Sequence, residues 1–143
     1  MHIRDVMTPN PRYVSPDDSI QNAARIMRDE DTGVVPVCDN GRAIGIVTDR
    51  DIVVRAIAED GQLNRPVRDI ATREVIAVTP DMSTREAAEL MSSHQVRRLP
   101  VVDGERLVGI VSIGDLAVKE AKDGRVGDTL QHISEGVKEQ EPK

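Results

Sequence analysis

Two short motifs in the chain place an aspartate three positions after a hydroxyl residue. They are Thr48 with Asp51 and Ser112 with Asp115, and each follows a short apolar run. This order predicts a buried strand that leads into a helix, with the hydroxyl residue at the N-cap and the aspartate at the third helical position. A helix N-terminus attracts phosphate, and a carboxylate accepts hydrogen bonds from the paired hydroxyls of a ribose. Nucleotide binding is therefore one interpretation of each motif.

The same spacing also has a purely structural interpretation. Ser/Thr-x-x-Asp is close to a capping box, in which the acid at the third position accepts a hydrogen bond from the N-cap backbone. A four-residue pattern leaves both interpretations open, so the surrounding sequence has to be considered.

Both motifs belong to an internal repeat. A shift of 64 positions aligns the two halves of the chain without a gap, because Asp51 then meets Asp115 and many other positions agree. Matching positions include Asp5 with Asp69, Pro16 with Pro80, Met27 with Met91, and Pro36 with Pro100.

Each repeat predicts the same order of elements. In the first, an extended segment at 12–14 precedes a helix at about 19–29, whose inner face is Ile20, Ala23, Ala24 and Met27. Strands at 34–38 and 43–48 follow, joined by a hairpin turn at Asn40-Gly41, and a helix at about 49–58 closes the repeat. In the second repeat, Ser83 and Glu86 predict a capping box, and Asp103-Gly104 predicts the turn. Because one such unit barely covers its own apolar face, we expect the two to pack on each other.

The composition suits a soluble globular protein. Of 143 residues, 38% are hydrophobic and 31% are charged, and Tyr13 is the only aromatic residue among Phe, Trp and Tyr. The net charge of −6 and the lack of a stacking platform argue against nucleic acid and against an anionic membrane surface. The sequence contains no segment as long as a membrane span and no apolar run of a signal peptide at its start, so we expect a cytoplasmic protein.

Residue types suited to catalysis or metal binding are not grouped in the sequence. Cys38 is the only cysteine, and its apolar surroundings predict a buried structural thiol. The histidines, His2, His94 and His132, do not have metal-ligand spacing, and no nucleophile is paired with a base. We therefore expect no catalytic residues, no metal site and no obligatory cofactor.

The order of these motifs strongly resembles the CBS (cystathionine beta-synthase) motif. In the first repeat the resemblance lies in residues 14–17, 33–37 and 45–51, and two such motifs in tandem resemble a CBS pair, or Bateman module. It implies an α/β (α+β) fold of two repeats, each a small three-stranded sheet with two helices, packed about a pseudo-twofold axis. The expected divisions are CBS motif 1 at 1–64, CBS motif 2 at 65–124, and a short C-terminal helix with a charged tail at 125–143.

The resemblance also implies an adenosyl ligand, namely AMP, ADP, ATP, NAD or S-adenosylmethionine, in clefts between the two motifs. Asp51 and Asp115 would hold ribose hydroxyls, and Thr48 and Ser112 would contact ribose or phosphate. Arg97 matches a family position that often reaches phosphates. The remaining expected nucleotide-binding residues are Val14, Ser15, Gly33, Val35, Pro36, Arg50, Val78, Thr79, Leu99 and Pro100.

The two implied sites are not equivalent. Arg50 opposes the helix dipole, and a nearby phosphate would relieve this conflict, whereas exposure to solvent is the alternative. The second repeat has Gly114 at the position of Arg50, Arg97 at that of Gly33, and Ala71 at that of Met7.

We therefore expect a regulatory module in signal transduction that senses an adenine nucleotide. The ligand would favour one arrangement of the halves and signal in trans to an effector protein that the sequence does not identify. Apolar outer helices favour a homodimer. The alternatives are a dimerisation scaffold without a ligand and a metal-responsive sensor that uses acidic residues or His94.

Overall fold

The computed structural model describes residues 1–73 and 76–123, which form two compact units. The first-repeat unit contains residues 12–73 together with Glu105–Leu107. The second-repeat unit contains Met1–Pro11, Ile76–Gly104 and residues 108–123. The C-terminal helix and tail expected at 125–143 lie outside the described residues.

The first-repeat unit is built on a hairpin of two antiparallel strands, β2 (Val34–Asp39) and β3 (Arg42–Thr48). Asn40 and Gly41 form the turn with φ values of 52° and 82°, as a tight hairpin turn requires. Helix α1 (Ile20–Glu30) precedes the hairpin, and the Ser19 side chain caps it by accepting from the Asn22 N–H at 3.0 Å. The predicted strands and helix are thus confirmed with shifts of one residue.

The helix that closes this unit changes its form along its length. It begins as α2 (Asp49–Asp51) and continues as the π-helical turn η2 (Ile52–Ile57). The sequence predicts one regular helix at 49–58, so the wider turn is a correction in detail. Ile52 and Ala56 are buried, whereas Val53, Val54 and Ile57 stay about half exposed.

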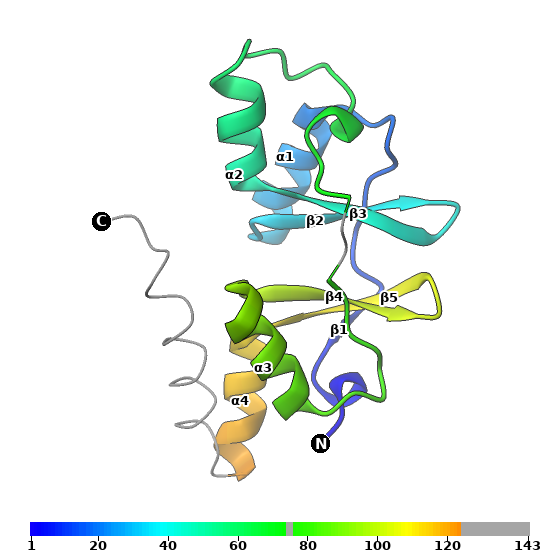
Figure 1. Cartoon of the computed structure of the whole chain (residues 1–143), viewed down its shortest axis with the longest axis vertical. Coiled ribbons are helices and arrows are strands. Elements are labelled where there is room, and N and C mark those ends of the chain that lie inside the picture. The colour runs from blue at the N-terminus through cyan, green and yellow to red at the C-terminus, as the bar shows by residue number, and fades with distance from the viewer. Residues whose placement is uncertain (74–75, 124–143) are drawn as a thin grey trace. The chain divides into compact units, whose positions relative to one another are not determined.

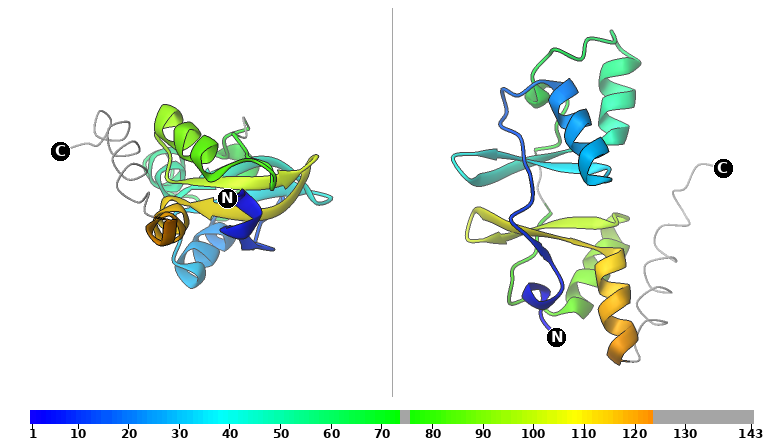
Figure 2. Two further views of the ribbon diagram at one scale, coloured as in Figure 1. Left: turned by 90° about the horizontal axis from the view of Figure 1, so that it is seen from below. Right: turned by 180° about the vertical axis from the view of Figure 1, so that it is seen from behind.

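The second-repeat unit repeats this plan. Strands β4 (Arg98–Asp103) and β5 (Arg106–Ser112) form its hairpin, and the helices are α3 (Thr84–His94) and α4 (Ile113–Asp123). Ser83 caps α3 by accepting from the Glu86 N–H at 3.1 Å. The Glu86 carboxylate accepts from the Ser83 hydroxyl, also at 3.1 Å. In each unit both helices cover the same face of the hairpin (Figures 1 and 2).

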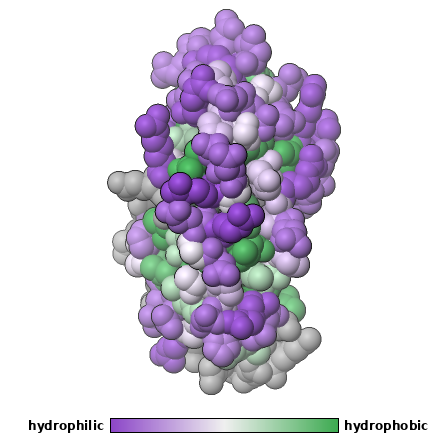
Figure 3. All heavy atoms as spheres, turned by 90° about the vertical axis from the view of Figure 1, so that its right-hand side faces the viewer, coloured by the Kyte–Doolittle hydropathy of each residue, from purple (hydrophilic) through white to green (hydrophobic). Residues whose placement is uncertain are grey.

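Each unit has its own aliphatic core. In the first-repeat unit, α1 contributes Ile20, Ala23, Ile26 and Met27, whereas Ala24 of the expected stripe is only partly buried. In the second-repeat unit the fully buried side chains include Met91, Leu99 and Leu116. On the face shown in Figure 3, hydrophilic residues predominate and apolar ones are interspersed.

The segment that leads into each repeat packs in the unit of the other repeat. Strand β1 (Thr8–Pro9) pairs antiparallel with β5, in the second-repeat unit. The matching segment of the second repeat includes the short helix η3 (Val67–Asp69), and Thr72 then forms a bridge with Ile46 in the first-repeat unit. The divisions at 64 and 124 therefore describe the sequence repeat, and the compact units follow a different division. Within the described residues no helix is long and apolar enough to cross a membrane.

Candidate functional site

The turn after β3 is a complete capping box. The Asp51 N–H donates to Thr48 Oγ1 at 3.0 Å, and the Thr48 N–H donates to Asp51 Oδ2 at 2.9 Å. Asp51 Oδ1 lies 3.9 Å from Arg55 Nε, and the Asp51 side chain is 13% exposed. The structural interpretation of this motif is therefore confirmed, and it uses one of the two carboxylate oxygens.

The turn after β5 has the same geometry. The Asp115 N–H donates to Ser112 Oγ at 3.1 Å, and the Ser112 N–H donates to Asp115 Oδ2 at 2.9 Å. Both pairs are partly buried. A carboxylate offers about four acceptor positions, so a single cap bond leaves capacity for hydroxyl groups of a ligand.

Each hairpin brings a further expected residue to its turn. In the first-repeat unit the Asp49 N–H donates to the Gly33 carbonyl at 2.9 Å, which places Gly33 beside the Thr48 turn. In the second-repeat unit the Ile113 N–H donates to the Arg97 carbonyl at 2.8 Å, so Arg97 takes the equivalent place. Arg50 is exposed in the first turn of its helix. A Cβ at Gly33 would lie 2.9 Å from the Asp49 carboxylate, which explains why the small residue accompanies Asp49.

Several expected site residues belong to the cores. The side chains of Val14, Val35, Val78 and Leu99 are at most 1% exposed, so only their backbones can contact a ligand. The resemblance implies adenine against both backbone and aliphatic side chains near these residues; for these four the side-chain part does not hold, and the backbone part stays a prediction. The other expected residues are Ser15, whose N–H donates to Asp18, the buried Pro36 and Pro100, and the exposed Thr79.

The described residues offer no cluster of three or more His, Cys, Asp or Glu that could hold a metal ion. The Nδ1 atom of His94 lies 3.1 Å from the Leu90 carbonyl oxygen and 3.2 Å from Ser93 Oγ, on its own helix. Cys38 is 2% exposed, and burial raises the pKa of its thiol to about 11. A neutral thiol at neutral pH is consistent with the structural role predicted for it.

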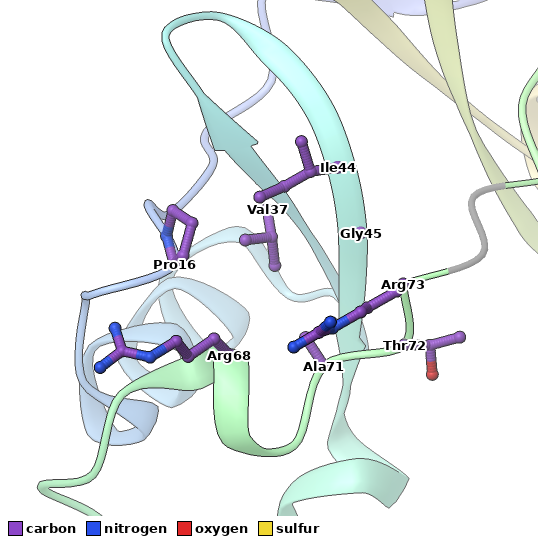
Figure 4. A pocket seen from close by; sticks show the side chains of 8 residues that line it. All are labelled: Pro16, Val37, Ile44, Gly45, Arg68, Ala71, Thr72 and Arg73. Atoms are coloured by element: carbon purple, nitrogen blue, oxygen red, sulfur yellow. The ribbon is translucent and has the colours of Figure 1, made fainter.

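The first-repeat unit also contains a pocket that the sequence did not predict. Its volume is about 270 Å³. Figure 4 shows Arg73 reaching along the pocket toward Ala71, while the Thr72 side chain points away. The only sequence signal was the replacement of Met7 by Ala71 at matched positions. The lining residues are Pro16, Val37, Ile44, Gly45, Arg68, Ala71, Thr72 and Arg73.

Comparison with known proteins supports the relationship that the motifs suggest. The sequence matches the CBS domain family over residues 3–57 and 67–121. It is 41% identical over 132 residues to the CBS domain-containing protein YhcV of Bacillus subtilis, covering 92% of this chain and 94% of YhcV.

Two solved structures have a similar fold. One is Hypoxic Response Protein I with two coordinated zinc ions, at a TM-score of 0.77, 36% identity and coverage of 82% of this chain and 98% of that one. The other is CBSX2 in complex with AMP, at a TM-score of 0.76, 28% identity and coverage of 87% and 98%. The fold, the paired turns and these matches show that the chain belongs to the CBS domain family and carries two CBS domains in tandem.

Proposed function

We propose that this protein is a regulatory sensor that binds an adenosyl ligand at its strand-to-helix turns. The observation that carries the proposal is the geometry of Asp51 and Asp115. Each uses Oδ2 to cap its helix, and this bond holds the carboxylate beside the helix N-terminus. The turn thus offers an oriented acceptor for ribose hydroxyls next to backbone dipoles that favour phosphate.

The residues near each turn suggest how the rest of the ligand is held. Arg50, exposed on the first helical turn, is the proposed phosphate contact in the first-repeat unit, and the exposed Arg97, from a different position of the repeat, is the proposed phosphate contact in the other unit. The backbone near Gly33 and Pro36 is the proposed surface for adenine. The AMP complex of CBSX2 supports an adenine nucleotide, and ADP, ATP, NAD and S-adenosylmethionine share the adenosyl part.

The proposed output is a shift in conformational populations that an effector protein detects. We also propose a symmetric homodimer, because the η2 turn exposes three large aliphatic side chains. Val53, Val54 and Ile57 are 55%, 46% and 54% exposed. Burying such a face against a second copy would remove it from water.

Thermal melting with AMP, ADP, ATP, NAD and S-adenosylmethionine tests the proposal. A ligand at a hundred times its Kd adds about 2.7 kcal/mol to the free energy of unfolding. For a chain of this size the midpoint should rise by about 3–8 °C. If none of the five ligands raises the melting temperature or gives a heat of binding, the sensor is refuted, and the scaffold without a ligand becomes the better explanation.

Variants of the two aspartates test which turn binds. Asp51→Asn keeps an oxygen that can accept from the Thr48 N–H but weakens the acceptor, so it should reduce affinity about 10- to 150-fold with little change in melting temperature. Asp115→Asn makes the same change in the other unit. Asp49→Asn is the matched control, because it removes a charge from the same helical turn without touching the proposed ribose contact. Equal affinity in all three variants and the wild type would contradict the ribose role.

A further inference from the structure

The internal repeat allows the pocket of the first-repeat unit to be compared with its own counterpart. In both units the leading segment of the other repeat crosses a strand at a glycine. An ideal Cβ on Gly45 would lie 2.7 Å from the Thr72 carbonyl oxygen, and one on Gly109 would lie 3.0 Å from the Thr8 carbonyl oxygen. The backbone framework is therefore shared, and differences between the two places arise from side chains.

One difference is a missing thioether. In the second-repeat unit Met7 fills the space beside Gly109, since its Sδ would lie 2.6 Å from an ideal Cβ there. Ala71 occupies the matched position in the first-repeat unit and ends at its Cβ. The pocket of about 270 Å³ opens at this place, between Ala71 and the side chains of Val37 and Ile44.

The other difference is a cation. Arg68 lines the pocket but forms an ion pair with Asp17, and Arg4 pairs with Asp81 in the same way in the second-repeat unit. Arg73 has Pro9 as its matched residue. Within residues 1–73 and 76–123 the structure gives Arg73 no ion pair, so its charge at the pocket is not balanced there by a carboxylate.

We propose that this pocket is a second ligand site, which binds a small amphiphilic carboxylate. Val37, Ile44, Ala71 and Pro16 offer a mostly apolar wall for an aliphatic or aromatic body. The single unbalanced guanidinium of Arg73 favours a monoanion, and its planar donors match a carboxylate in a bidentate contact. No lining residue is among those proposed for the nucleotide, so this site is independent of the proposed sensor function.

The size of the pocket limits the body of the ligand. A volume near 270 Å³ is just below the range of about 300–1,000 Å³ that is usual for small-molecule sites, and it suits a chain of several carbons more than a whole nucleotide. Octanoate is therefore a suitable probe, and octanamide has the same body without the charge. We expect octanoate to bind the 143-residue chain with a Kd of about 1 mM or tighter. Octanamide should bind about 10-fold more weakly or worse, because it lacks the charged contact.

Isothermal titration of variants separates the two parts of the site. Ala71→Met places in this pocket the side chain that the second-repeat unit already accommodates, so it should abolish octanoate binding while the melting temperature stays the same or rises. Arg73→Gln should reduce octanoate affinity about 10-fold and leave octanamide unchanged. Arg4→Gln is the matched control, because it removes an arginine from the other unit and should leave octanoate binding unchanged.

Three results would overturn the proposal. They are the absence of octanoate binding to the wild type at about 10 mM, undiminished binding to a folded Ala71→Met variant, and competition between octanoate and AMP. Competition would assign octanoate to the nucleotide site. Because octanoate binding is measured without nucleotide, failure of the adenosyl sensor would leave this test unaffected.

Discussion

Replacing Gly45 by alanine should weaken the first-repeat unit through a backbone clash. An added Cβ would lie 2.7 Å from the Thr72 carbonyl oxygen, so the two segments must move apart. This movement strains two backbone hydrogen bonds between Ile46 and Thr72. The Ile46 N–H donates to the Thr72 carbonyl at 3.0 Å, and the Thr72 N–H donates to the Ile46 carbonyl at 2.9 Å. Two weakened backbone hydrogen bonds cost about 1–3 kcal/mol together. Alanine also restricts the unfolded chain more than glycine does, and this offsets about 0.4–1 kcal/mol of the lost stability.

The midpoints of these two ranges give a net loss of about 1.3 kcal/mol for Gly45→Ala, measured as the free energy of unfolding in urea. Gly109→Ala is the matched variant, because its added Cβ first meets the flexible Met7 side chain, with Sδ at 2.6 Å. Met7→Ala removes the side chain that the new Cβ meets. The double variant Gly109→Ala/Met7→Ala should therefore be about 1 kcal/mol more stable than the sum of the two single losses predicts, because residues in contact are coupled. Adding Ala71→Gly to Gly45→Ala should recover nothing, because the clash involves backbone. If Gly45→Ala unfolds within about 0.3 kcal/mol of the wild type, this account of the close approach is refuted.

Three further predictions concern single side chains. Thr48→Ala removes the acceptor of the Asp51 N–H and should lower the free energy of unfolding by about 0.5–2 kcal/mol in urea; no change would contradict the capping role. Burial raises the Cys38 pKa to about 11, so the native state holds this proton more tightly than the unfolded state. Stability from this group should be complete below pH 9 and lost between about pH 9 and 11, and Cys38→Ala should flatten that part of the pH profile. Val54→Glu should convert the proposed dimer to a monomer in light scattering, and a dimer of unchanged mass would show that this face is not the interface.

The hairpins and helices were predictable because local chemistry determines them. Asn40-Gly41 favours a tight turn, Ser83 with Glu86 predicts the start of a helix, and short apolar runs predict the strands. The capping boxes were also predictable from their spacing. These features depend on neighbours within a few positions, and the sequence shows those neighbours directly.

The remaining features depend on residues far apart in the chain. The exchange of leading segments pairs Thr8 with Ile110 and Thr72 with Ile46, and no local pattern reports such partners. The pocket exists because the short side chain of Ala71 leaves open a space that Met7 fills in the second-repeat unit. The sequence shows the two residue types, and only the folded backbone shows the space between them and their neighbours. Val35 was expected among the nucleotide-binding residues, and the core buries its side chain, because tertiary packing determines which face of a strand is covered. A contact through its backbone stays a prediction.

The two units are completed at different times as the ribosome produces the chain. The first-repeat unit has nearly all of its residues once position 73 has been made. Strand β1 (Thr8–Pro9) must instead wait for β5, roughly a hundred residues later, which at 5–20 residues per second is a delay of about 5–20 s. During this interval Ile3 and Val6, which are at most 8% exposed in the folded protein, lack their final partners. This segment is thus synthesised long before its partners are available to bury it, and a chaperone could bind it during that interval.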